Sequence, residues 1–325
     1  MKVLVIGAAG MVGRKLTAAL PAAGQVGGQA IESLMLADIV VPEKPAASLP
    51  ISTMATDLSE LGSAAILLQD RPDLIFHLAA IVSGEAEADF EKGYRINLDG
   101  TRYLFEAIRL SGQPYRPRVV FTSSIAIFGE PLPAVIGDDQ DHTPLTSYGT
   151  QKAICELLLA DYSRRGFLDG VGIRLPTIAV RPGKPNKAAS GFFSGIIREP
   201  LAGMEAILPV DDSVRHWFAS PRAAVGFLLH AAQVDTAPLG QRRNLTMPGL
   251  SVTVADQIAA LQRVAGSAAA QLIRRQPDEV IAKIVAGWPQ AFDAQRALAL
   301  GFRAETSFDE IIRIHIEDEL PPAQP

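Results

Sequence analysis

A glycine-rich turn near the start of the chain constrains the fold more than any other feature. The apolar, β-branched run at residues 3–6 leads into Gly7, Gly10 and Gly13, and an apolar helical pattern follows. A strand, a glycine turn and a helix in this order are typical of a dinucleotide-binding unit. Gly7 permits a tight turn, Gly10 lets the backbone approach a pyrophosphate, and Gly13 lets the helix pack closely on its strand. The alternative is a purely structural glycine turn.

Two acidic residues at expected strand ends indicate which dinucleotide is bound. The strand at residues 33–37 ends in Asp38, at the distance from the last glycine where a carboxylate binds the adenosine ribose hydroxyls. A carboxylate there repels a ribose phosphate, and the sequence puts no Arg or Lys beside it, so NAD is favoured over NADP. A further strand at residues 51–55 leads to Asp57 and Leu58, where a carboxylate could reach the adenine amino group. A helix N-cap is an equal alternative for Asp57.

Composition excludes several classes of function. The 325 residues are 48% hydrophobic and 20% charged, as in ordinary globular proteins. A net charge of −5 gives no basic face for nucleic acid. No apolar run is long enough for a membrane span, and the first one is too short for a signal peptide, so we expect a cytoplasmic protein without a membrane partner. The single cysteine, Cys155, excludes an internal disulfide and a multi-cysteine metal site. We expect no metal and interpret Cys155 as a small core residue.

The middle of the chain continues the alternation of strands and helices. Residues 74–80 and 118–124 form apolar runs of the kind that buried parallel strands have. His77 is interpreted as a packed strand residue. Between these runs we expect one long helix over residues 86–110, in which Asn97 interrupts the apolar positions. A buried amide must find partners, so Asn97 either caps a local backbone defect or holds a water near the site. The hydroxyl of Ser124 stands at a strand end that faces the ligand crevice of such sheets.

The chemistry is expected at Tyr148 and Lys152, which lie one helical turn apart on the same face of a helix. A phenol with a pKa near ~10 is a poor base at neutral pH, but a neighbouring cation favours the phenolate and lowers the pKa. Tyr148 is therefore a candidate general base, with Lys152 as the residue that tunes it. The same helix continues with more apolar residues than one sheet face needs, which favours a subunit interface and a homodimer.

The second half of the chain is less regular. A strand at residues 171–175 closes the first half, and helices are expected near residues 188–201, 220–233, 253–264, 277–286 and 307–319. We expect an α/β fold of the Rossmann type, with a doubly wound parallel sheet in an NAD-binding domain over residues 1–175. Residues 176–325 are expected to form a smaller, mostly helical substrate-binding region that is intertwined with the first.

The residues named so far occur in the order that is typical of one superfamily. Gly7, Gly10 and Gly13 fit a GxxGxxG turn, and Tyr148 with Lys152 fits a YxxxK motif. The chain resembles the extended short-chain dehydrogenase/reductases, and among them the NAD-dependent epimerase/dehydratase family, over nearly its whole length. The resemblance implies an NAD-dependent enzyme; a scaffold or redox sensor that only binds NAD is the alternative, but such proteins usually lose the Tyr or the Lys.

The resemblance also implies roles for individual residues. Ser124 polarises the substrate oxygen, Tyr148 is the acid/base, Lys152 holds the ribose and tunes Tyr148, and Asn97 is the polar helix residue. The residues expected to bind the cofactor are Gly7, Gly10, Met11, Val12, Gly13, Asp38, Asp57, Leu58, Leu78, Ala79, Ala80, Asn97, Tyr148, Lys152, Pro176 and Thr177.

Two branches of the family compete for the substrate. Nucleotide-sugar epimerases and dehydratases typically read R-x-x-N and R-D-(Y/F)-I-H-V in the second half, and here Thr177 replaces the asparagine while His216 and Ala219 replace the Asp and the His. The chain looks more like a branch that oxidises four-carbon sugar acids such as D-erythronate. That likeness implies oxidation of the hydroxyl beside the carboxylate to a 2-keto acid, with NADH as the second product.

A sugar-acid substrate needs a cation for its carboxylate, and a guanidinium can bind one with two parallel hydrogen bonds. Arg215 is the preferred candidate, because its position faces a substrate phosphate in the epimerases that the chain resembles. Arg181 is a second candidate and Arg174 a third, although both could instead bind backbone carbonyls. The substrate-binding residues expected from these arguments are Ser124, Tyr148, Arg181 and Arg215.

Overall fold

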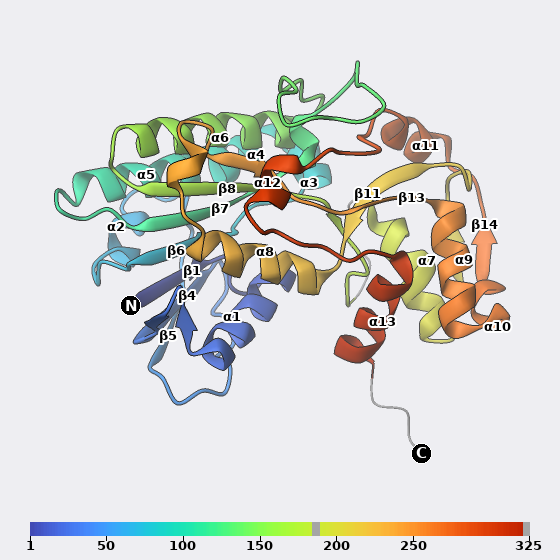
Figure 1. Ribbon diagram of the computed structural model, residues 1–325, viewed down its shortest axis with the longest axis horizontal. Coiled ribbons are helices and arrows are strands. Elements are labelled where there is room, and N and C mark those ends of the chain that lie inside the picture. The colour runs from blue at the N-terminus through green and yellow to red at the C-terminus, as the bar shows by residue number, and fades with distance from the viewer. Residues whose placement is uncertain (184–188, 321–325) are drawn as a thin grey trace. The chain divides into compact units, whose positions relative to one another are not determined.

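A computed structural model describes residues 1–183 and 189–320, which form two compact units (Figure 1). The first unit contains Met1–Ile127, Pro144–Leu175 and Val225–Met247, and the second contains Phe128–Thr143, Pro176–Ala224 and Pro248–Pro325. The boundary expected at residue 175 is one of the points where the chain passes between the units. A single boundary at residue 175 does not separate the units. The first unit also contains residues 225–247, and the second also contains residues 128–143.

The first unit is built on a seven-stranded sheet in which every pairing is parallel. The strands are β1 (Lys2–Ile6), β4 (Ser33–Asp38), β5 (Ile51–Ala55), β6 (Leu74–His77), β7 (Arg118–Ser124), β8 (Asp169–Leu175) and β12 (Asn244–Thr246). Their order is β12-β8-β7-β6-β1-β4-β5. The chain leaves β1 toward one edge and returns at β6 to build the other, so the order reverses between these two strands. Open α/β sheets bind ligands at such a point, beyond the carboxyl ends of the strands. The expected Rossmann-type sheet is confirmed.

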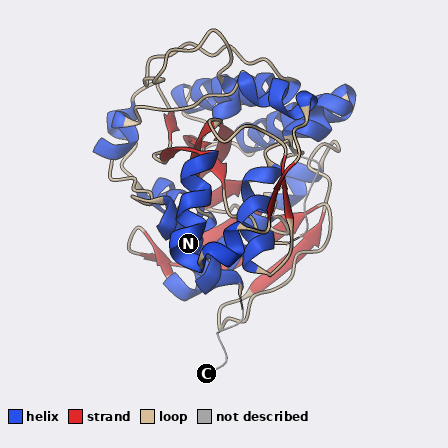
Figure 2. Cartoon of the chain, turned by 90° about the vertical axis from the view of Figure 1, so that its right-hand side faces the viewer, coloured by secondary structure: helices blue, strands red, loops and turns tan. Residues whose placement is uncertain are grey.

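Helices cover both faces of this sheet (Figures 1 and 2). In Figure 1, α5 (Gly100–Leu110) and α6 (Ser147–Arg164) lie above the strands, and α1 (Met11–Ala23) with α8 (Pro221–Gln233) lies below them. The short α2 (Ser63–Leu67) packs against α5. The core under α2, α5 and α6 includes the fully buried residues Leu4, Ile75, Phe105, Phe121 and Leu159. Each side chain of this size contributes roughly 1.5–3 kcal/mol on burial, so this interface fixes α6 on the sheet.

The single helix expected over residues 86–110 is wrong. The chain instead forms α3 (Ser83–Ala88), α4 (Phe90–Gly93), a π-helical turn η1 (Tyr94–Asp99) and then α5. Asp89 separates the first two helices, because it has an extended φ of −132° and accepts a hydrogen bond from the Lys92 amide. Asn97 lies within the π-helical turn, and such turns are frequent at functional sites.

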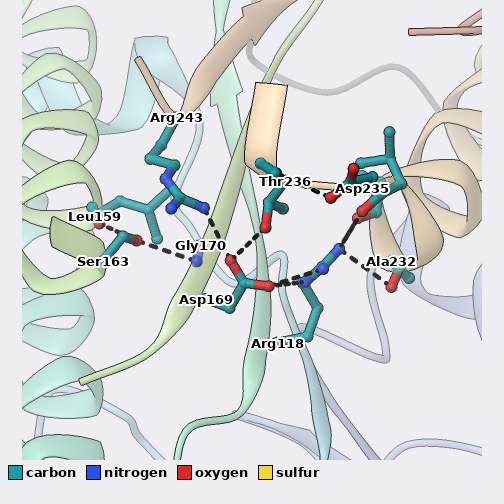
Figure 3. Close-up of polar contacts among 12 residues, drawn as sticks. Arg118, Leu159, Ser163, Asp169, Gly170, Ala232, Asp235, Thr236 and Arg243 are labelled. Atoms are coloured by element: carbon teal, nitrogen blue, oxygen red, sulfur yellow. Dashed lines mark hydrogen bonds and ion pairs between the residues drawn. The ribbon is translucent and has the colours of Figure 1, made fainter. Parts of the chain in front are cut away.

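The strand β12 and its attachment were not predicted. Asp169, the first residue of β8, accepts hydrogen bonds from Arg118, Thr236 and Arg243 (Figure 3). We call these four residues the Asp169 node. Burial opposes ionisation, but the charge of Arg118 and the hydrogen bonds hold the pKa of Asp169 below its usual range. Arg118 also donates to backbone carbonyls at the end of α8. The node therefore fastens α8 and β12 to the amino ends of β7 and β8.

The second unit combines two small sheets with helices. Strands β9 (Thr177–Ile178), β11 (Arg215–Ala219) and β13 (Leu250–Thr253) form one sheet, and β10 (Ala206–Leu208) pairs with β14 (Ile273–Arg275). The helices are α7 (Gly191–Leu201), α9 (Val254–Ala265), α10 (Ser267–Ala270), α11 (Glu279–Ala286), α12 (Gln295–Ala299) and α13 (Phe308–Glu319). The expected helices are present, except that residue 188 lies outside the described residues and α7 begins at Gly191. The core includes Phe193, Phe218, Leu261 and Ile312.

Three small elements complete the chain. A hairpin of β2 (Gln25–Val26) and β3 (Gln29–Ala30) follows α1, and two short 3-10 turns are η2 (Ile125–Ile127) and η3 (Ala237–Leu239). The turn η2 matters for the site, because it connects β7 to the segment that precedes α6.

Candidate active site

Two of the three turn glycines are required by packing. Gly7 has a φ of +91°, and a Cβ on it would lie 2.6 Å from the Ala79 amide nitrogen. A Cβ on Gly13 would lie 2.1 Å from the Gly7 carbonyl oxygen. A Cβ on Gly10 would meet the same oxygen at 3.4 Å, which a small shift could relieve. Packing therefore explains Gly7 and Gly13, and the close approach of a ligand to Gly10 stays a prediction.

The first turn of α1 has the features of an anion site. Gly10 is the N-cap residue, and no side chain caps the helix. The first amides of a helix have no partner within it, so those of Met11, Val12 and Gly13 are available to a phosphate. A pyrophosphate fits this cradle, because backbone donors surround it and no Cβ fills it. The expected neighbours Leu78, Ala79 and Ala80 follow β6 and are partly exposed beside the turn.

Asp38 is oriented by the glycine turn. Its Oδ2 accepts a hydrogen bond from the Ala9 amide at 2.8 Å, and its Oδ1 accepts one from the Ile39 amide at 2.7 Å. The first turn of α1 contacts the same residue, Ala9, through its carbonyl. The Nη1 of Arg14 donates to the Ala9 carbonyl oxygen at 2.7 Å. Ile39 and Val40 are exposed beyond Asp38 and offer apolar surface of the kind that suits an adenine ring.

Asp57 already has partners in the structure. It accepts hydrogen bonds from the Ser59 amide at 2.9 Å and from the Ser59 hydroxyl at 2.5 Å, and Arg95 pairs with it at 3.1 Å. Although burial opposes ionisation, these contacts hold the pKa of Asp57 below its usual range. The helix N-cap alternative is wrong, because the N-cap residue of α2 is Gly62. The Leu58 side chain belongs to the core, which leaves its backbone for a ligand.

The start of α6 holds Tyr148 close to Ser124. The helix begins after Thr146, whose hydroxyl accepts a hydrogen bond from the Gly149 amide. A Cβ on Gly149 would lie 2.2 Å from the Ala126 carbonyl oxygen, so only glycine allows α6 to approach the chain after β7 this closely. The Ser124 hydroxyl is close enough to the Tyr148 phenol to lower its pKa. The structure therefore brings together the two groups expected to hold the reacting oxygen.

Lys152 is a buried cation on the same helix. Only 3% of the residue is exposed, and its Nζ donates to the Thr122 carbonyl oxygen at 2.8 Å. The Nζ lies 5.7 Å from the centroid of the Tyr148 ring. Burial lowers the pKa of Lys152 to about 8, while the nearby Cys155 and Glu156 oppose that shift. The ammonium is thus held near the phenol without a direct hydrogen bond to its oxygen.

The Tyr148 pKa shifts in the direction opposite to the expected one. Burial raises the pKa of this phenol to about 12, and the nearby Ser124 hydroxyl only partly opposes the shift. The spacing of Tyr148 and Lys152 in the sequence predicted a lowered pKa. The reason is geometric: the phenol is withdrawn from water, whereas the Lys152 ammonium points to the Thr122 carbonyl.

Asn97 connects three segments around the site. Its side chain accepts a hydrogen bond from the Ile81 amide and donates to the Ile81 carbonyl and to Gln151. Asn97 and Gln151 are both buried. The amide therefore ties the segment after β6 to α6, one residue before Lys152. Asn97 lies in the π-helical turn, but the partners of its side chain are Ile81 and Gln151, outside that turn, so neither alternative is confirmed.

A buried ion pair fixes the next turn of α6. Arg174 on β8 binds both carboxylate oxygens of Glu156, with Nε–Oε1 at 3.0 Å and Nη2–Oε2 at 2.8 Å. Only 8% of the Arg174 side chain and 1% of the Glu156 side chain are exposed. Arg174 is therefore committed to the scaffold, and the third candidate for the substrate carboxylate is wrong.

The second unit contains the two remaining arginine candidates. Arg215 is exposed at the start of β11, where it donates to the Ser251 carbonyl. Arg181 is half-buried, and its Nη2 donates to the Ser190 hydroxyl at 3.1 Å. Burial and the charge of Arg198 lower the pKa of Arg181. Within residues 1–183 and 189–320, no carboxylate forms an ion pair with Arg181.

Thr177 and His216, which depart from the epimerase pattern, contact each other. The His216 Nδ1 lies 2.9 Å from the Pro289 carbonyl oxygen, so this nitrogen carries the proton. Burial lowers the pKa of His216 to about 4, so the ring is neutral and its Nε2 accepts the hydroxyl proton of Thr177 at 2.7 Å. Pro176, the other expected cofactor residue of this segment, is buried.

One cavity in the described part of the first unit lies away from the glycine turn. A cavity of about 290 Å³ lies at the amino ends of β1 and β4 and is lined by Lys2, Ser33 and Ser52. The glycine turn lies at the other end of these strands, beyond their carboxyl ends. The described part of the chain has no cluster of three potential metal ligands and no helix that could cross a membrane.

The sequence did not predict several residues that position the expected site residues. These residues are Arg14, Thr122, Gly149 and Gln151, and their roles depend on contacts between distant segments. Gly149 alone carried a signal, because a glycine directly after the expected catalytic tyrosine weakens a helix unless close packing requires it.

Comparisons with known proteins agree with this geometry. A model of the family described as "NAD dependent epimerase/dehydratase family" matches residues 3–245. A D-erythronate dehydrogenase from Cupriavidus necator is 49% identical over 98% of this chain and 98% of that protein. A second one, from Haemophilus influenzae, is 43% identical over 98% of this chain and 100% of that protein.

Solved structures give the same fold under other names. A crystal structure named as the nucleoside-diphosphate-sugar epimerase from Agrobacterium tumefaciens is 64% identical, with a TM-score of 0.97 over 98% of this chain and 94% of that one. An L-threonine dehydrogenase from Cupriavidus necator is 22% identical, with a TM-score of 0.83 over 98% of this chain and 99% of that one, which is a likeness of fold.

Proposed function

Because the chain belongs to the NAD-dependent epimerase/dehydratase family, we propose that it is an NAD-dependent dehydrogenase that oxidises D-erythronate or a similar 2-hydroxy sugar acid to the 2-keto acid. The observation that carries the proposal is the match to two D-erythronate dehydrogenases along nearly the whole chain. The contact between Ser124 and Tyr148, with Lys152 on the next turn, supplies the chemistry that such an oxidation needs.

The cofactor in this proposal is NAD, which accepts the hydride when it is bound. The free amides of the first turn of α1 would hold its pyrophosphate, and the Asp38 carboxylate would accept the ribose hydroxyls. Tyr148, Lys152, Asn97, Pro176 and Thr177 remain proposed neighbours of its nicotinamide half. The segment of Asp57 and Leu58, with Leu78, Ala79 and Ala80, is proposed to line its adenosine half.

Tyr148 removes the proton of the substrate hydroxyl in this mechanism. Ser124 donates a hydrogen bond to the reacting oxygen, and the phenolate of Tyr148 accepts the proton as the hydride leaves the same carbon. A phenol with a pKa of about 12 is mostly protonated at neutral pH. The proposed mechanism therefore needs the Lys152 ammonium, which donates to the Thr122 carbonyl oxygen, to stabilise the phenolate.

A guanidinium of the second unit is proposed to bind the substrate carboxylate. Arg181 is favoured over Arg215, because it is half-buried and its described partners are neutral groups, whereas Arg215 is exposed. Loss of a partner in a desolvated charge pair costs roughly 2–5 kcal/mol. Arg181→Met should therefore reduce kcat/KM for D-erythronate by roughly 30-fold or more. Arg215→Met is the matched comparison, and a larger loss there would give the role to Arg215.

A nucleotide-sugar epimerase is the second candidate function. It is supported by the name of the structure that is 64% identical to this chain. Against it, Thr177 stands where the epimerases carry an asparagine, and its hydroxyl proton is bound by His216. Calorimetric titration of the NAD-loaded protein with D-erythronate and with UDP separates the two. Micromolar UDP binding without NADH formation from D-erythronate would reject the dehydrogenase.

We further propose a cytoplasmic homodimer that acts in carbohydrate metabolism. Helix α6 leaves Leu157 exposed at 66%, which gives a second copy an apolar contact. The buried free thiol of Cys155 fits a reducing compartment. Light scattering of the wild type and of Leu157→Glu tests the dimer: a dimer that survives the added charge unchanged would place the interface elsewhere.

A further inference from the structure

The chain between the two residues proposed to hold the reacting oxygen is fastened to itself. Ser124 ends β7, and after η2 the chain passes through a loop of residues 128–143 before α6 brings Tyr148. At the base of this loop, the Thr143 hydroxyl donates to the Gly129 carbonyl oxygen at 2.6 Å and accepts from the Gly129 amide at 3.3 Å. We call this pair of hydrogen bonds the Thr143 clasp. It holds the chain that leaves Ser124 beside the chain that leads to Tyr148.

The outer end of the same loop is fastened as well. Ile136 forms a parallel bridge with Phe292, and both side chains are buried. The Ile136 amide donates to the Ala291 carbonyl oxygen at 2.9 Å, and the Ile136 carbonyl oxygen accepts from the Asp293 amide at 2.9 Å. All these contacts lie within the second unit. The loop is therefore held at its base and at its outer end, as a brace is.

Ala126 connects the base of the loop to the two proposed site residues. Its amide donates to the Ser124 Oγ at 3.1 Å, so the proton of that hydroxyl is left for another acceptor. A Cβ on Gly149 would lie 2.2 Å from the Ala126 carbonyl oxygen and 3.0 Å from the Pro144 Cβ. Pro144 directly follows the clasp, and Gly149 directly follows Tyr148. Because the packing here is so close, a shift at the clasp reaches both site residues.

We infer that Thr143 is a positioning residue for the oxidation, because its hydroxyl holds Ser124 and Tyr148 at the separation that lets both contact one substrate oxygen. The inference rests on the proposed dehydrogenase function. Thr143 acts through the chain on either side of it and touches neither substrate nor cofactor in this mechanism. A misplacement of about 1 Å can lower a rate by roughly 10²-fold, whereas one neutral hydrogen bond contributes little to stability. Loss of the hydroxyl should therefore affect the rate much more than the stability.

The first test compares variants of two threonines in the full chain. Thr143→Val removes the hydroxyl and keeps the shape of the side chain, whereas Thr143→Ser keeps the hydroxyl. Thr236→Val is the matched control, because Thr236 is also half-buried and its hydroxyl donates to Asp169 at 2.9 Å in the Asp169 node. Thr143→Val should lower kcat for D-erythronate about tenfold or more and leave the Kd for NAD within about twofold.

Thr143→Ser should restore most of the lost rate, and Thr236→Val should keep kcat within about twofold of the wild type. Both valine variants should show a similar small drop in melting temperature. A wild-type kcat in Thr143→Val overturns the inference, and so does a Thr143→Ser variant as slow as Thr143→Val.

A second variant pair separates positioning from a general loosening of the fold. Without the Ser124 hydroxyl the clasp has no pair to hold, so adding Thr143→Val to Ser124→Ala should lower kcat by less than about twofold. Residues that act as a unit are non-additive in this way. A further loss of about tenfold in the double variant would show that the clasp does not act through Ser124 and Tyr148.

A readout that needs no turnover distinguishes this inference from the proposed function. The carbon NMR signal of the Tyr148 Cζ, assigned with Tyr148→Phe, reports the surroundings of the phenol. Ser124→Ala and Thr143→Val should shift this signal in the same direction, and Thr143→Ser and Thr236→Val should leave it in place. If the wild type never oxidises D-erythronate, the proposed function fails, and this signal still decides the role of the clasp. A Tyr148 signal that does not respond to Thr143→Val overturns that role.

Discussion

Carboxylates at the two ends of the parallel strands have different partners. At the carboxyl ends of the strands, Asp38 accepts hydrogen bonds from two backbone amides, and no cation within residues 1–183 and 189–320 forms an ion pair with it. At the amino ends, Asp169 is neutralised by Arg118 and Arg243 and bonded by Thr236 (Figure 3). A carboxylate without a counter-charge can still accept hydrogen bonds from a ligand, whereas a carboxylate paired with two arginines stabilises the fold. Changes at one end should therefore alter activity, and changes at the other should alter stability.

Tyr148→Phe should give the largest effect and should leave stability nearly unchanged. The ring packs as before, but the acid/base proton is lost, so kcat for D-erythronate should fall about 10²–10⁴-fold. NAD affinity should stay within a few-fold. Steady-state kinetics, fluorescence titration with NAD and thermal unfolding measure the three quantities. Near-normal turnover in this variant would remove Tyr148 from the mechanism.

Asp169→Asn should give the converse result. The change leaves Arg118 and Arg243 partly buried without their counter-charge. Removing one partner of a buried pair costs roughly 3–5 kcal/mol, and we expect about 2–4 here because the side chains in the node are 12–20% exposed. Urea unfolding should show this loss while kcat of the folded fraction is preserved.

The matched control for Asp169 is Asp161→Asn. Asp161 pairs with Arg164 on the surface of α6, and both side chains are more than half exposed. Such pairs contribute little, so its unfolding free energy should change by less than about 0.5 kcal/mol. Equal losses in the two variants would contradict the view that the Asp169 node is a structural fastening.

Asp38→Ala should weaken NAD without lowering the melting temperature. A hydrogen bond to a charged group contributes roughly 1.5–3 kcal/mol, so the Kd for NAD should rise about 10-fold to 150-fold. Calorimetry measures the affinity, and a thermal scan without ligand measures the stability. A drop in the melting temperature as large as that of Asp169→Asn would remove the contrast between the two ends of the sheet.

Lys152 should give the smallest effect, a rise of stability with pH. Its pKa is about 8 in the folded chain and 10.5 ordinarily, so above pH 8 the unfolded chain binds the proton that the folded chain has released. The free energy of unfolding should therefore rise by about 1 kcal/mol between pH 8 and pH 9. Lys152→Met should lack this rise.

The window for that measurement is set by the neighbours of Lys152. Burial raises the pKa of Cys155 to about 11 and that of Tyr148 to about 12. As the pH rises above their ordinary pKa values of 9.0 and 10.0, these two groups lower the free energy of unfolding. Their contributions therefore oppose that of Lys152 at higher pH. A wild type whose stability stays flat from pH 8 to pH 9 would show that the Lys152 ammonium is better solvated than its burial indicates.

Sequence reasoning predicted the features that are encoded locally. The glycine turn, the strand that ends at Asp38 and the helix of Tyr148 and Lys152 each depend on a short stretch with a recognisable period or spacing. Gly7 and Gly13 could be assigned because a turn of this type admits no Cβ there, and the structure gives the contacts that a Cβ would violate.

The features that were missed depend on contacts between distant segments. The three residues of β12 are too few to produce a periodic pattern, and they become a strand because β8 pairs with them. Arg14 and Asp38 contact the same residue, Ala9, only after β1 and β4 have paired. The pKa of Tyr148 depends on how deeply α6 packs, which a spacing of four residues does not contain.

The late position of β12 has a consequence for how the chain is made. Seven strands form the sheet, but the last one arrives at residues 244–246, long after β8 ends at Leu175. Until the ribosome has delivered that segment, β8 is an edge strand with unpaired backbone groups, and such edges recruit other chains. If the first six strands pair during synthesis, the sheet has one open side until residues 244–246 are made. Arg118 and Asp169 are made before Arg243, whose ion pair with Asp169 fastens β12 to β8.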